Sequence, residues 1–393
     1  MHVIIVGAGI GGLVSALCLN KKGHKVEIYE QAERLSELGA GVQLSPNATN
    51  VLNYLDLTED LKSYIFEPKS FQFLNYKTGK IIAERKLGSA IEEDFGSPNY
   101  DVHRADLQKV LLNRIKAKDI SLHTDKQVNK VGNKESCAFI EVAGKEIEAD
   151  IVIGADGIHS MVSNTLFGEK ERAFTGNVAW RMLIPVESLP KDLILPDTTV
   201  WLGPKKHFVT YHVNGGRNIN CVCLVEQEGW KSESWSEKGE IKDLKLAYKG
   251  WNKTIETLLD YANPDSLYKW ALHDRLPMKN WAEGRICILG DAAHPMLPFL
   301  AQGAAMAIED GAVIADCITN FENASEGLQY FEKIRKPRTT YVQMAARRNA
   351  KVLHLSGLAA FFRNLVMGYV GNKIFFKLYS YNALTALADN KES

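Results

Sequence analysis

The sequence predicts a two-domain α/β protein of the α+β kind, and three features support this fold class. The chain begins with an apolar segment, 1–6, that runs directly into a glycine-rich turn and a helical pattern. Two further apolar segments, 150–155 and 285–289, end in turns that carry an aspartate. Between them lie stretches of alternating apolar residues, which predict a second sheet. We therefore expect a Rossmann-like domain with an inserted, mostly antiparallel β-sheet domain and C-terminal helices.

The expected domains are interleaved along the chain. Strand patterns at 71–76 and 81–84, and again at 178–185, 199–202, 207–211 and 218–224, are assigned to the second sheet. Helical patterns follow at 333–353 and 355–379. We expect a nucleotide-binding domain (1–70, 101–170 and 276–330), a substrate domain (71–100 and 171–275) and a C-terminal helical segment (331–393).

A glycine fingerprint lies between the first strand and the first helix. Gly7 allows a tight turn, Gly9 allows a pyrophosphate to approach the backbone, and Gly12 allows the helix and strand to pack closely. The helix opens through Leu13, and a second strand ends at Glu30, close to the spacing at which an acid binds ribose hydroxyls. The combination predicts a dinucleotide site.

A second part of this site is expected after the strand at 285–289. Gly290 and Asp291 follow this strand, where a carboxylate can accept hydrogen bonds from sugar hydroxyls. A loop containing Pro298 then leads to a helix that begins near Gln302 and Gly303-Ala304. The N–H groups and positive dipole end of this helix suit an electron-rich group. A large, polyhydroxylated, redox-active cofactor fits these parts.

Two more motifs complete the pattern. Arg104 opens a helical segment, where its guanidinium can meet a phosphate. Asp156-Gly157 closes the strand at 150–155. With the glycine fingerprint and Gly290-Asp291, the chain resembles the single-component (class A) FAD-dependent aromatic hydroxylases, which para-hydroxybenzoate hydroxylase typifies. It is most similar to salicylate hydroxylase, 3-hydroxybenzoate 6-hydroxylase and 6-hydroxynicotinate 3-monooxygenase.

The resemblance implies a set of residues for non-covalent FAD. Glu30 and the fingerprint glycines would bind its adenosine end, Arg104 its diphosphate and Asp291 its ribityl chain. Asp156 would serve both FAD and the nicotinamide. The segment Gly39-Ala-Gly41-Val42 resembles the one beside the flavin ring. The full cofactor-binding set is Gly7, Gly9, Gly12, Leu13, Glu30, Gly41, Val42, Arg104, Val128, Asp156, Gly290, Asp291, Pro298, Gly303 and Ala304.

The segment 207–211 is the most informative for catalysis. Strand alternation places His207 and Tyr211 on one face, where imidazole and phenol can act on a ring substituent. They resemble the substrate-site pair of the hydroxynicotinate and hydroxybenzoate enzymes; the alternative is an edge histidine and a core tyrosine. Gln302 is the third catalytic candidate. His294 suits a loop-bracing interaction better than catalysis, and Arg181 fits a substrate contact or a salt bridge equally well.

The resemblance implies the reaction. NADH or NADPH would reduce the flavin, which captures O₂ as a flavin hydroperoxide and hydroxylates a small phenolic or heteroaromatic acid, with His207 as the base. Two alternatives stay open. One is a hydroxylase of a larger substrate, such as a ubiquinone precursor, urate or a polyketide. The other is a flavoprotein without hydroxylase activity or an NAD(P)H oxidase.

Composition limits the partners. Among 393 residues, Lys plus Arg equals Asp plus Glu at 47 each, so no basic excess recruits nucleic acid. The six cysteines are scattered and no metal site is expected. Because no secretory signal is visible, we expect a cytoplasmic protein. We expect it to be a monomer or a homodimer. The apolar segment 357–371 is too short to span a bilayer, and we expect it to cover the flavin domain rather than anchor the protein.

Overall fold

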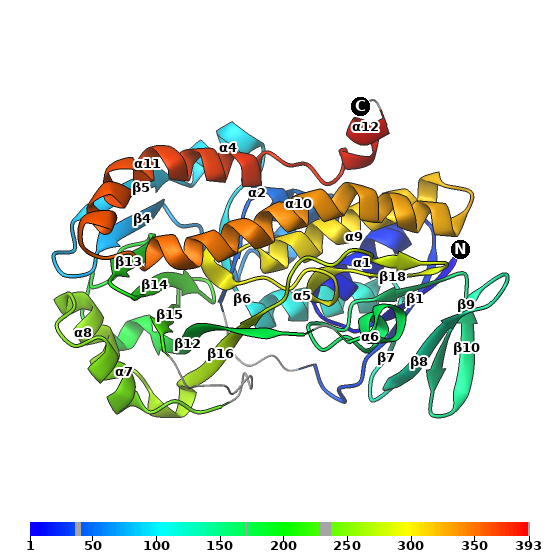
Figure 1. Ribbon diagram of the computed structural model, residues 1–393, viewed down its shortest axis with the longest axis horizontal. Helices are drawn as coiled ribbons and strands as arrows, with labels where there is room; N and C mark the ends of the chain where they lie inside the picture. The colour runs from blue at the N-terminus through cyan, green and yellow to red at the C-terminus, as the bar shows by residue number, and fades with distance from the viewer. Residues whose placement is uncertain (36–40, 170, 228–236, 392–393) are drawn as a thin grey trace.

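The computed structural model describes residues 1–35, 41–169, 171–227 and 237–391. Two large sheets lie at opposite ends of an elongated molecule (Figure 1). The first has the order β17-β18-β11-β1-β2-β7, and all its pairs are parallel except β17–β18. Its strands are β1 (His2–Val6), β2 (Lys25–Tyr29), β7 (Ser121–His123), β11 (Ile151–Gly154), β17 (Ala282–Glu283) and β18 (Ile286–Ile288). This mixed α/β architecture confirms the predicted fold class.

Helices pack on the first sheet because its central strands, β1, β11 and β18, are apolar and buried. The fully buried strand β11 accounts for the continuous apolar run in the sequence. Helix α1 (Ile10–Lys21) lies against α9 (Gly303–Asn320) and α5 (Arg104–Ala117), and α2 (Pro46–Tyr54) also packs on α9. A Cβ atom at Gly311 would lie 2.9 Å from the backbone nitrogen of Ser15, so α1 and α9 can approach this closely only with glycine there.

The second sheet has the order β16-β12-β15-β14-β13-β4-β5, and only β13–β4 is parallel. Its strands are β4 (Ser70–Asn75), β5 (Ile81–Lys86), β12 (Ala173–Pro185), β13 (Thr198–Gly203), β14 (Lys206–Val213), β15 (Asn218–Glu226) and β16 (Tyr268–Asp274). Apolar side chains on one face pack with α7 (Ile241–Ala247) and α8 (Lys253–Asp260). The predicted hairpin and strands therefore belong to one sheet.

Smaller elements fill the edges. β3 (Gly41–Leu44) pairs with β6 (Tyr100–His103), and β8 (Val128–Asn133), β9 (Ala138–Val142) and β10 (Lys145–Ala149) form a three-stranded sheet. The short helices are α3 (Thr58–Leu61), α4 (Ser89–Phe95), α6 (Met161–Phe167), α12 (Ala386–Lys391), η1 (Val186–Ser188), η2 (Pro264–Ser266), η3 (Gly290–Ala292) and η4 (Pro298–Leu300). The division into domains remains a proposal.

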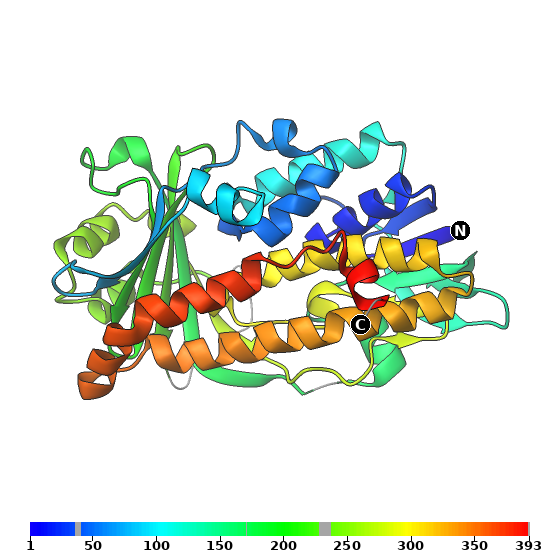
Figure 2. The same ribbon diagram turned by 90° about the horizontal axis from the view of Figure 1, so that it is seen from above.

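One of the two long C-terminal helices spans the molecule, and the other covers one end of it. α10 (Ala324–Leu353) runs along the long axis, and α11 (Gly357–Tyr379) turns back beside β5 (Figures 1 and 2). The sequence pattern predicted that the first of these helices would begin at residue 333. The helix begins earlier, where the Asn323 side chain accepts a hydrogen bond from the Ser325 amide and so caps the first turn.

Candidate active site

The fingerprint glycines form a tight turn between β1 and α1. Gly7 has φ +105°, and a Cβ at Gly12 would lie only 2.1 Å from the Gly7 carbonyl oxygen. By contrast, a Cβ at Gly9 would meet no described atom within 4 Å. Gly7 and Gly12 are therefore required for the packing of this turn. Open space remains beside Gly9, where a pyrophosphate can approach. Leu13 is fully buried in the core behind this turn.

Glu30 is held directly beside the fingerprint. Its carboxylate accepts hydrogen bonds from the backbone amides of Ala8 and Ala32, each at 2.8 Å. These two contacts fix the carboxylate at the end of β2, next to the turn. An ionised carboxylate accepts more than two hydrogen bonds, so capacity remains for ribose hydroxyls.

Asp291 lies in the one-turn helix η3 directly after β18, and its side chain is exposed within a large cavity. Among the described residues, it makes no hydrogen bond. Helix α9 begins nearby at Gly303, and no side chain caps its first turn. Arg104, the first residue of α5, lines the same cavity. A carboxylate without a hydrogen bond among the described residues, the uncapped amides and a guanidinium thus face the space where a dinucleotide would lie.

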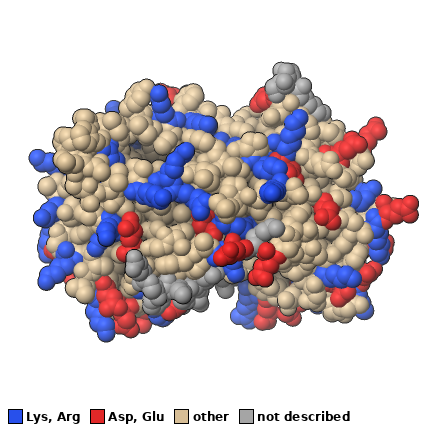
Figure 3. Space-filling view, in the orientation of Figure 1, with Lys and Arg blue, Asp and Glu red and all other residues tan. Residues whose placement is uncertain are grey.

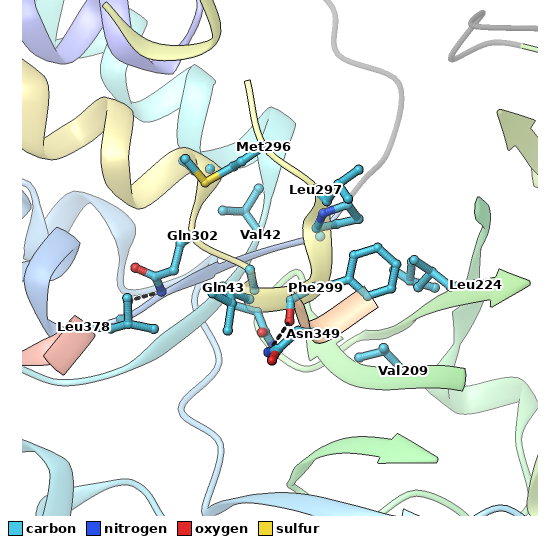
Figure 4. A pocket seen from close by; sticks show the side chains of 18 of the residues that line it. Val42, Gln43, Val209, Leu224, Met296, Leu297, Phe299, Gln302, Asn349 and Leu378 are labelled. Atoms are coloured by element: carbon cyan, nitrogen blue, oxygen red, sulfur yellow. Dashed lines mark hydrogen bonds between the residues drawn. The ribbon is translucent and has the colours of Figure 1, made fainter. Parts of the chain in front are cut away.

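The cavity has a volume of about 530 Å³ and extends from the fingerprint to the second sheet. Gly9 and Asp291 line one end, and His207, Val209 and Tyr211 of β14 line the other. Figure 4 shows Val209 and Leu224 of the second sheet opposite Met296, Leu297 and Phe299 of the loop that follows Asp291. The strand alternation predicted from 207–211 therefore places both expected catalytic residues in one cavity.

His207 is buried and forms a chain with two residues from distant parts of the sequence. Its Nδ1 lies 2.8 Å from Nε2 of His354, the residue that directly follows α10. Nδ1 of His354 lies 3.0 Å from Oε1 of Glu226, at the end of β15. The Glu226 side chain is 40% exposed, so this series of hydrogen bonds connects the cavity with solvent.

The carboxylate of Glu226 orients the protons along this chain. Because an ionised carboxylate only accepts hydrogen bonds, neutral His354 carries its proton on Nδ1 and accepts at Nε2 from Nδ1–H of His207. Nε2 of His207 is then the basic nitrogen, and it has no hydrogen-bond partner among the described residues. Burial lowers the pKa of His207 well below 6.5, and His354 adds to this shift. Burial also lowers the pKa of His354, although Glu226 opposes that effect.

Tyr211 packs against the backbone of β3. A Cβ at Gly41 would lie 2.5 Å from the Tyr211 ring, so only glycine fits beside it. Asn220, paired with Tyr211 in the sheet, accepts a hydrogen bond from the Gly41 amide at 3.1 Å. The Asn220 side-chain nitrogen is buried without a partner among the described residues. Burial, with Asp101 nearby, raises the pKa of Tyr211 well above 10, so its hydroxyl stays protonated.

Three expected site residues make other contacts. The Gln302 amide donates to Ser45 Oγ at 2.9 Å and accepts from Asn47 at 3.1 Å, which ties the start of α9 to α2. The Asp156 carboxylate accepts hydrogen bonds from the Ser160 hydroxyl and the Val162 amide and caps α6. Val128 is buried in the core and does not line the cavity. Their assigned functions remain predictions.

Most of the remaining candidate residues line the cavity. Val42, Pro298, Gly303 and Ala304 line the cavity, and Gly290, with φ +58°, precedes Asp291 in it. Gly39 and Ala40, which belong to the expected flavin-ring segment, lie outside the described residues. Arg181 lines the cavity and lies over the Tyr268 and Trp270 rings.

His294 is a bracing residue, as the sequence favoured. Its Nε2 lies 2.6 Å from Oδ2 of Asp310, and both side chains are buried. Arg335 contacts the other carboxylate oxygen of Asp310 at 2.7 Å. These two contacts of Asp310 hold the loop after Asp291 against α9 and α10.

The sequence reasoning missed His354, Glu226 and Asn220. Asn220 had a usable signal, since a buried amide in an apolar strand needs a partner. His354 lies just beyond a long helical pattern, and Glu226 just beyond a predicted strand. No local pattern indicates that these two meet His207, because their contact depends on how α10 crosses the second sheet.

The fold and site define the class of this protein. A parallel sheet with a glycine fingerprint, an acid at the end of β2 and an aspartate at the mouth of an uncapped helix define a dinucleotide-binding flavoprotein fold. The open space at Gly9 and the unpartnered Asp291 fit FAD. Comparison with known proteins gives the family. Residues 1–346 match the model of the FAD binding domain family, to which this chain belongs.

Characterised relatives cover nearly the whole chain. The chain is 34% identical over 357 residues to 3-amino-4-hydroxybenzoate 2-monooxygenase of Streptomyces cremeus, covering 90% of this chain and 88% of the relative. It is 32% identical over 354 residues to 6-hydroxynicotinate 3-monooxygenase of Pseudomonas fluorescens, covering 88% and 91%. The protein is thus a class A flavin hydroxylase, an FAD-dependent aromatic monooxygenase.

Solved structures share the fold at lower identity. HpxO of Klebsiella pneumoniae, complexed with FAD and uric acid, has a TM-score of 0.87 at 22% identity and covers 98% of this chain and 97% of that one. A salicylate hydroxylase substrate complex has a TM-score of 0.83 at 24% identity, again covering 98% and 97%. Both likenesses concern the fold.

Proposed function

We propose that this protein hydroxylates a small phenolic or heteroaromatic acid, with non-covalent FAD, NADH or NADPH as reductant and O₂ as the oxygen source. The observation that carries this proposal is the basic Nε2 of His207 in a cavity that also reaches the fingerprint and Asp291. The names of the relatives support the substrate class, since they act on aminohydroxybenzoate and hydroxynicotinate.

The chain's own residues would hold FAD at one end of the cavity. Glu30 takes the ribose hydroxyls, Arg104 the diphosphate and Asp291 the ribityl hydroxyls, while the amides of α9 face the ring system. Bound FAD, once reduced by the nicotinamide, supplies the oxygen-activating chemistry. The apolar side chains of the lining keep water away from this reaction.

The substrate is oriented by groups from the second sheet. Arg181 brings positive charge to the cavity, which favours a substrate that carries a carboxylate. The unpartnered amide nitrogen of Asn220 and the hydroxyl of Tyr211 offer hydrogen bonds to ring substituents. These polar groups, set in an apolar cavity, would fix the position of the ring relative to FAD.

His207 then acts as the base. Its Nε2 accepts the proton of the substrate hydroxyl, which makes the ring more nucleophilic. As that proton arrives, Nδ1 of His207 passes its proton to Nε2 of His354, and Nδ1 of His354 passes its proton to Glu226. Each transfer follows an existing hydrogen bond, and the last acceptor is in contact with solvent.

A screen of oxygen uptake tests this function. FAD-loaded protein is mixed with NADH or NADPH, and oxygen consumption is recorded with salicylate, 3-hydroxybenzoate, 6-hydroxynicotinate or urate. We expect one of the small aromatic acids to accelerate consumption and to yield a hydroxylated product. Stimulation by urate alone would show that the substrate is a larger heterocycle. Peroxide formation that no aromatic compound changes would show an oxidase instead.

We also infer the setting of this reaction. NADH or NADPH would dock only transiently, since the described part of the chain carries one glycine fingerprint, which FAD occupies. We propose a cytoplasmic protein, monomeric or homodimeric. Fractionation of cells and light scattering of the purified protein test these two statements directly.

A further inference from the structure

Helix α11 exposes an unusually apolar surface. Its outer face, as named here, consists of Leu358, Phe361, Phe362, Leu365, Tyr369 and Phe376, which are between 62% and 80% exposed. With Val366 and Val370, this helix holds eight of the seventeen exposed large apolar residues in the described part of the chain. Single exposed apolar residues are ordinary on protein surfaces, whereas a continuous group marks an interaction site.

Except at Phe376, whose ring meets that of Phe95 in α4, the outer face is separate from the face that α11 uses for folding. Arg363, Met367 and Leu378 on the opposite side are buried, and Met367 and Leu378 also line the cavity. The guanidinium of Arg363 holds the end of α10 by donating to the Val352 and Leu353 carbonyls. Because the inner side already anchors the helix, stability of the fold does not require apolar residues on the outer face.

The sequence of the two C-terminal helices is one-sided in charge, and the acids nearest to α11 are those of α4, Glu92, Glu93 and Asp94, beside its C-terminal end. Between Lys333 and Ala388 the sequence holds ten Lys or Arg residues and no Asp or Glu, although the whole chain is neutral. Lys373 and Lys377 on α11, and Arg348 and Lys351 on α10, are exposed. In Figure 3 a surface without charged side chains over α11 at the upper left is bordered by blue side chains over the adjacent half of α10.

We propose that the outer face of α11 binds the surface of an anionic phospholipid bilayer. The helix would lie in the plane of the interface, with the aromatic and aliphatic side chains among the acyl chains and the exposed lysines at the headgroups. No described helix is long and apolar enough to cross a membrane, so the contact is interfacial. A second copy of the chain fits less well, because a symmetric contact would bring two sets of exposed lysines and arginines together.

Vesicle sedimentation tests this surface. FAD-loaded protein is mixed with vesicles of phosphatidylcholine alone or of phosphatidylcholine with phosphatidylserine. We expect binding to the anionic vesicles, little binding to the neutral ones, and release at high salt. Equal binding to both vesicles, or to neither, would overturn the proposal.

Matched variants locate the contact. Phe362→Ser/Leu365→Ser and Lys351→Gln/Lys373→Gln should each weaken vesicle binding at least about fivefold, since each basic or apolar contact contributes on that scale. Leu246→Ser on α7, a leucine 72% exposed, and Lys242→Gln, 79% exposed, are the controls and should bind like the parent. Thermal unfolding checks that every variant folds.

Light scattering distinguishes a second copy from a membrane. If Phe362→Ser/Leu365→Ser converts a dimer to a monomer and the parent ignores anionic vesicles, the outer face is a subunit interface and the proposal is wrong. If the oligomeric state is the same in parent and variant while vesicle binding falls, the lipid surface is supported.

Discussion

Nδ1 of His207 lies 2.8 Å from Nε2 of His354, although 147 positions separate them in the chain. One belongs to the second sheet and the other to the end of α10, so the contact forms only when the long helix packs across that sheet. His354 in turn meets Glu226. Together the three residues provide a base in the cavity and a path for its proton to solvent.

Replacing His207 should separate the two halves of the reaction. In His207→Ala, NADH or NADPH should still reduce bound FAD at close to the parent rate, because the base acts on the substrate. Product formation should fall by about 10²-fold or more, the usual scale for a lost acid–base catalyst. Single-turnover reduction and the product formed per NAD(P)H consumed measure the two steps. If the product formed per NAD(P)H consumed were unchanged, His207 would not be the base.

Glu226→Gln should slow proton release while leaving FAD binding intact. Since a neutral amide no longer enforces the tautomer of His354, we expect product formation to fall about tenfold and its pH profile to change. Glu256→Gln is the control, because its parent side chain is 42% exposed, against 40% for Glu226. If both variants show the parent profile, the proton leaves by another path.

The two buried histidines should make the folded state sensitive to acid. Their pKa values are lowered in the folded protein, so below about pH 6.5 the unfolded chain binds more protons. The contribution of the two histidines to stability is therefore fully present above that pH and is lost as the pH decreases through it, by at most about 1.4 kcal/mol per histidine for each pH unit. Urea unfolding of His207→Gln/His354→Gln should show a weaker pH dependence. Parallel curves for parent and variant would contradict these shifts.

Two glycines of the fingerprint should respond differently to alanine. Gly12→Ala places a Cβ 2.1 Å from the Gly7 carbonyl oxygen and should destabilise the fold by about 3 kcal/mol or more. Gly9→Ala meets no described atom within 4 Å, so its stability should change by less than about 0.5 kcal/mol while FAD binds at least tenfold more weakly. The melting temperature of each variant measures its stability, and titration with FAD measures its affinity. Normal FAD affinity in Gly9→Ala would place the pyrophosphate elsewhere.

Asp291→Ala should weaken FAD binding without harming the fold. The carboxylate is exposed in the cavity and makes no hydrogen bond among the described residues; only the charge of Arg275 interacts with it, so its loss should leave stability near the parent value. The ribityl hydroxyls would lose their acceptor, which costs about 1–3 kcal/mol of binding free energy. Fluorescence titration of the apoprotein with FAD measures this loss, and an unaltered dissociation constant would overturn the assignment of Asp291.

Local patterns predicted the parts of the site that depend on local structure. Gly7 and Gly12 follow from the strand–turn–helix sequence, and alternation along β14 was enough to place His207 and Tyr211 in one cavity. Gln302 shows the limit of such patterns. Its position at the start of α9 was predicted, but its amide is engaged by Ser45 and Asn47 of a distant segment. Contacts of this kind depend on tertiary packing, as does the meeting of His207 with His354.

The most direct test of the proposed hydroxylation is the origin of the oxygen in the product. FAD-loaded protein turns over NADH or NADPH with its aromatic acid under isotopically labelled dioxygen, and mass spectrometry analyses the product. The proposal predicts one labelled oxygen atom in each product molecule and one product per reductant when coupling is complete. Product that carries oxygen from water, or labelled hydrogen peroxide with no hydroxylated product from any acid tested, would contradict it.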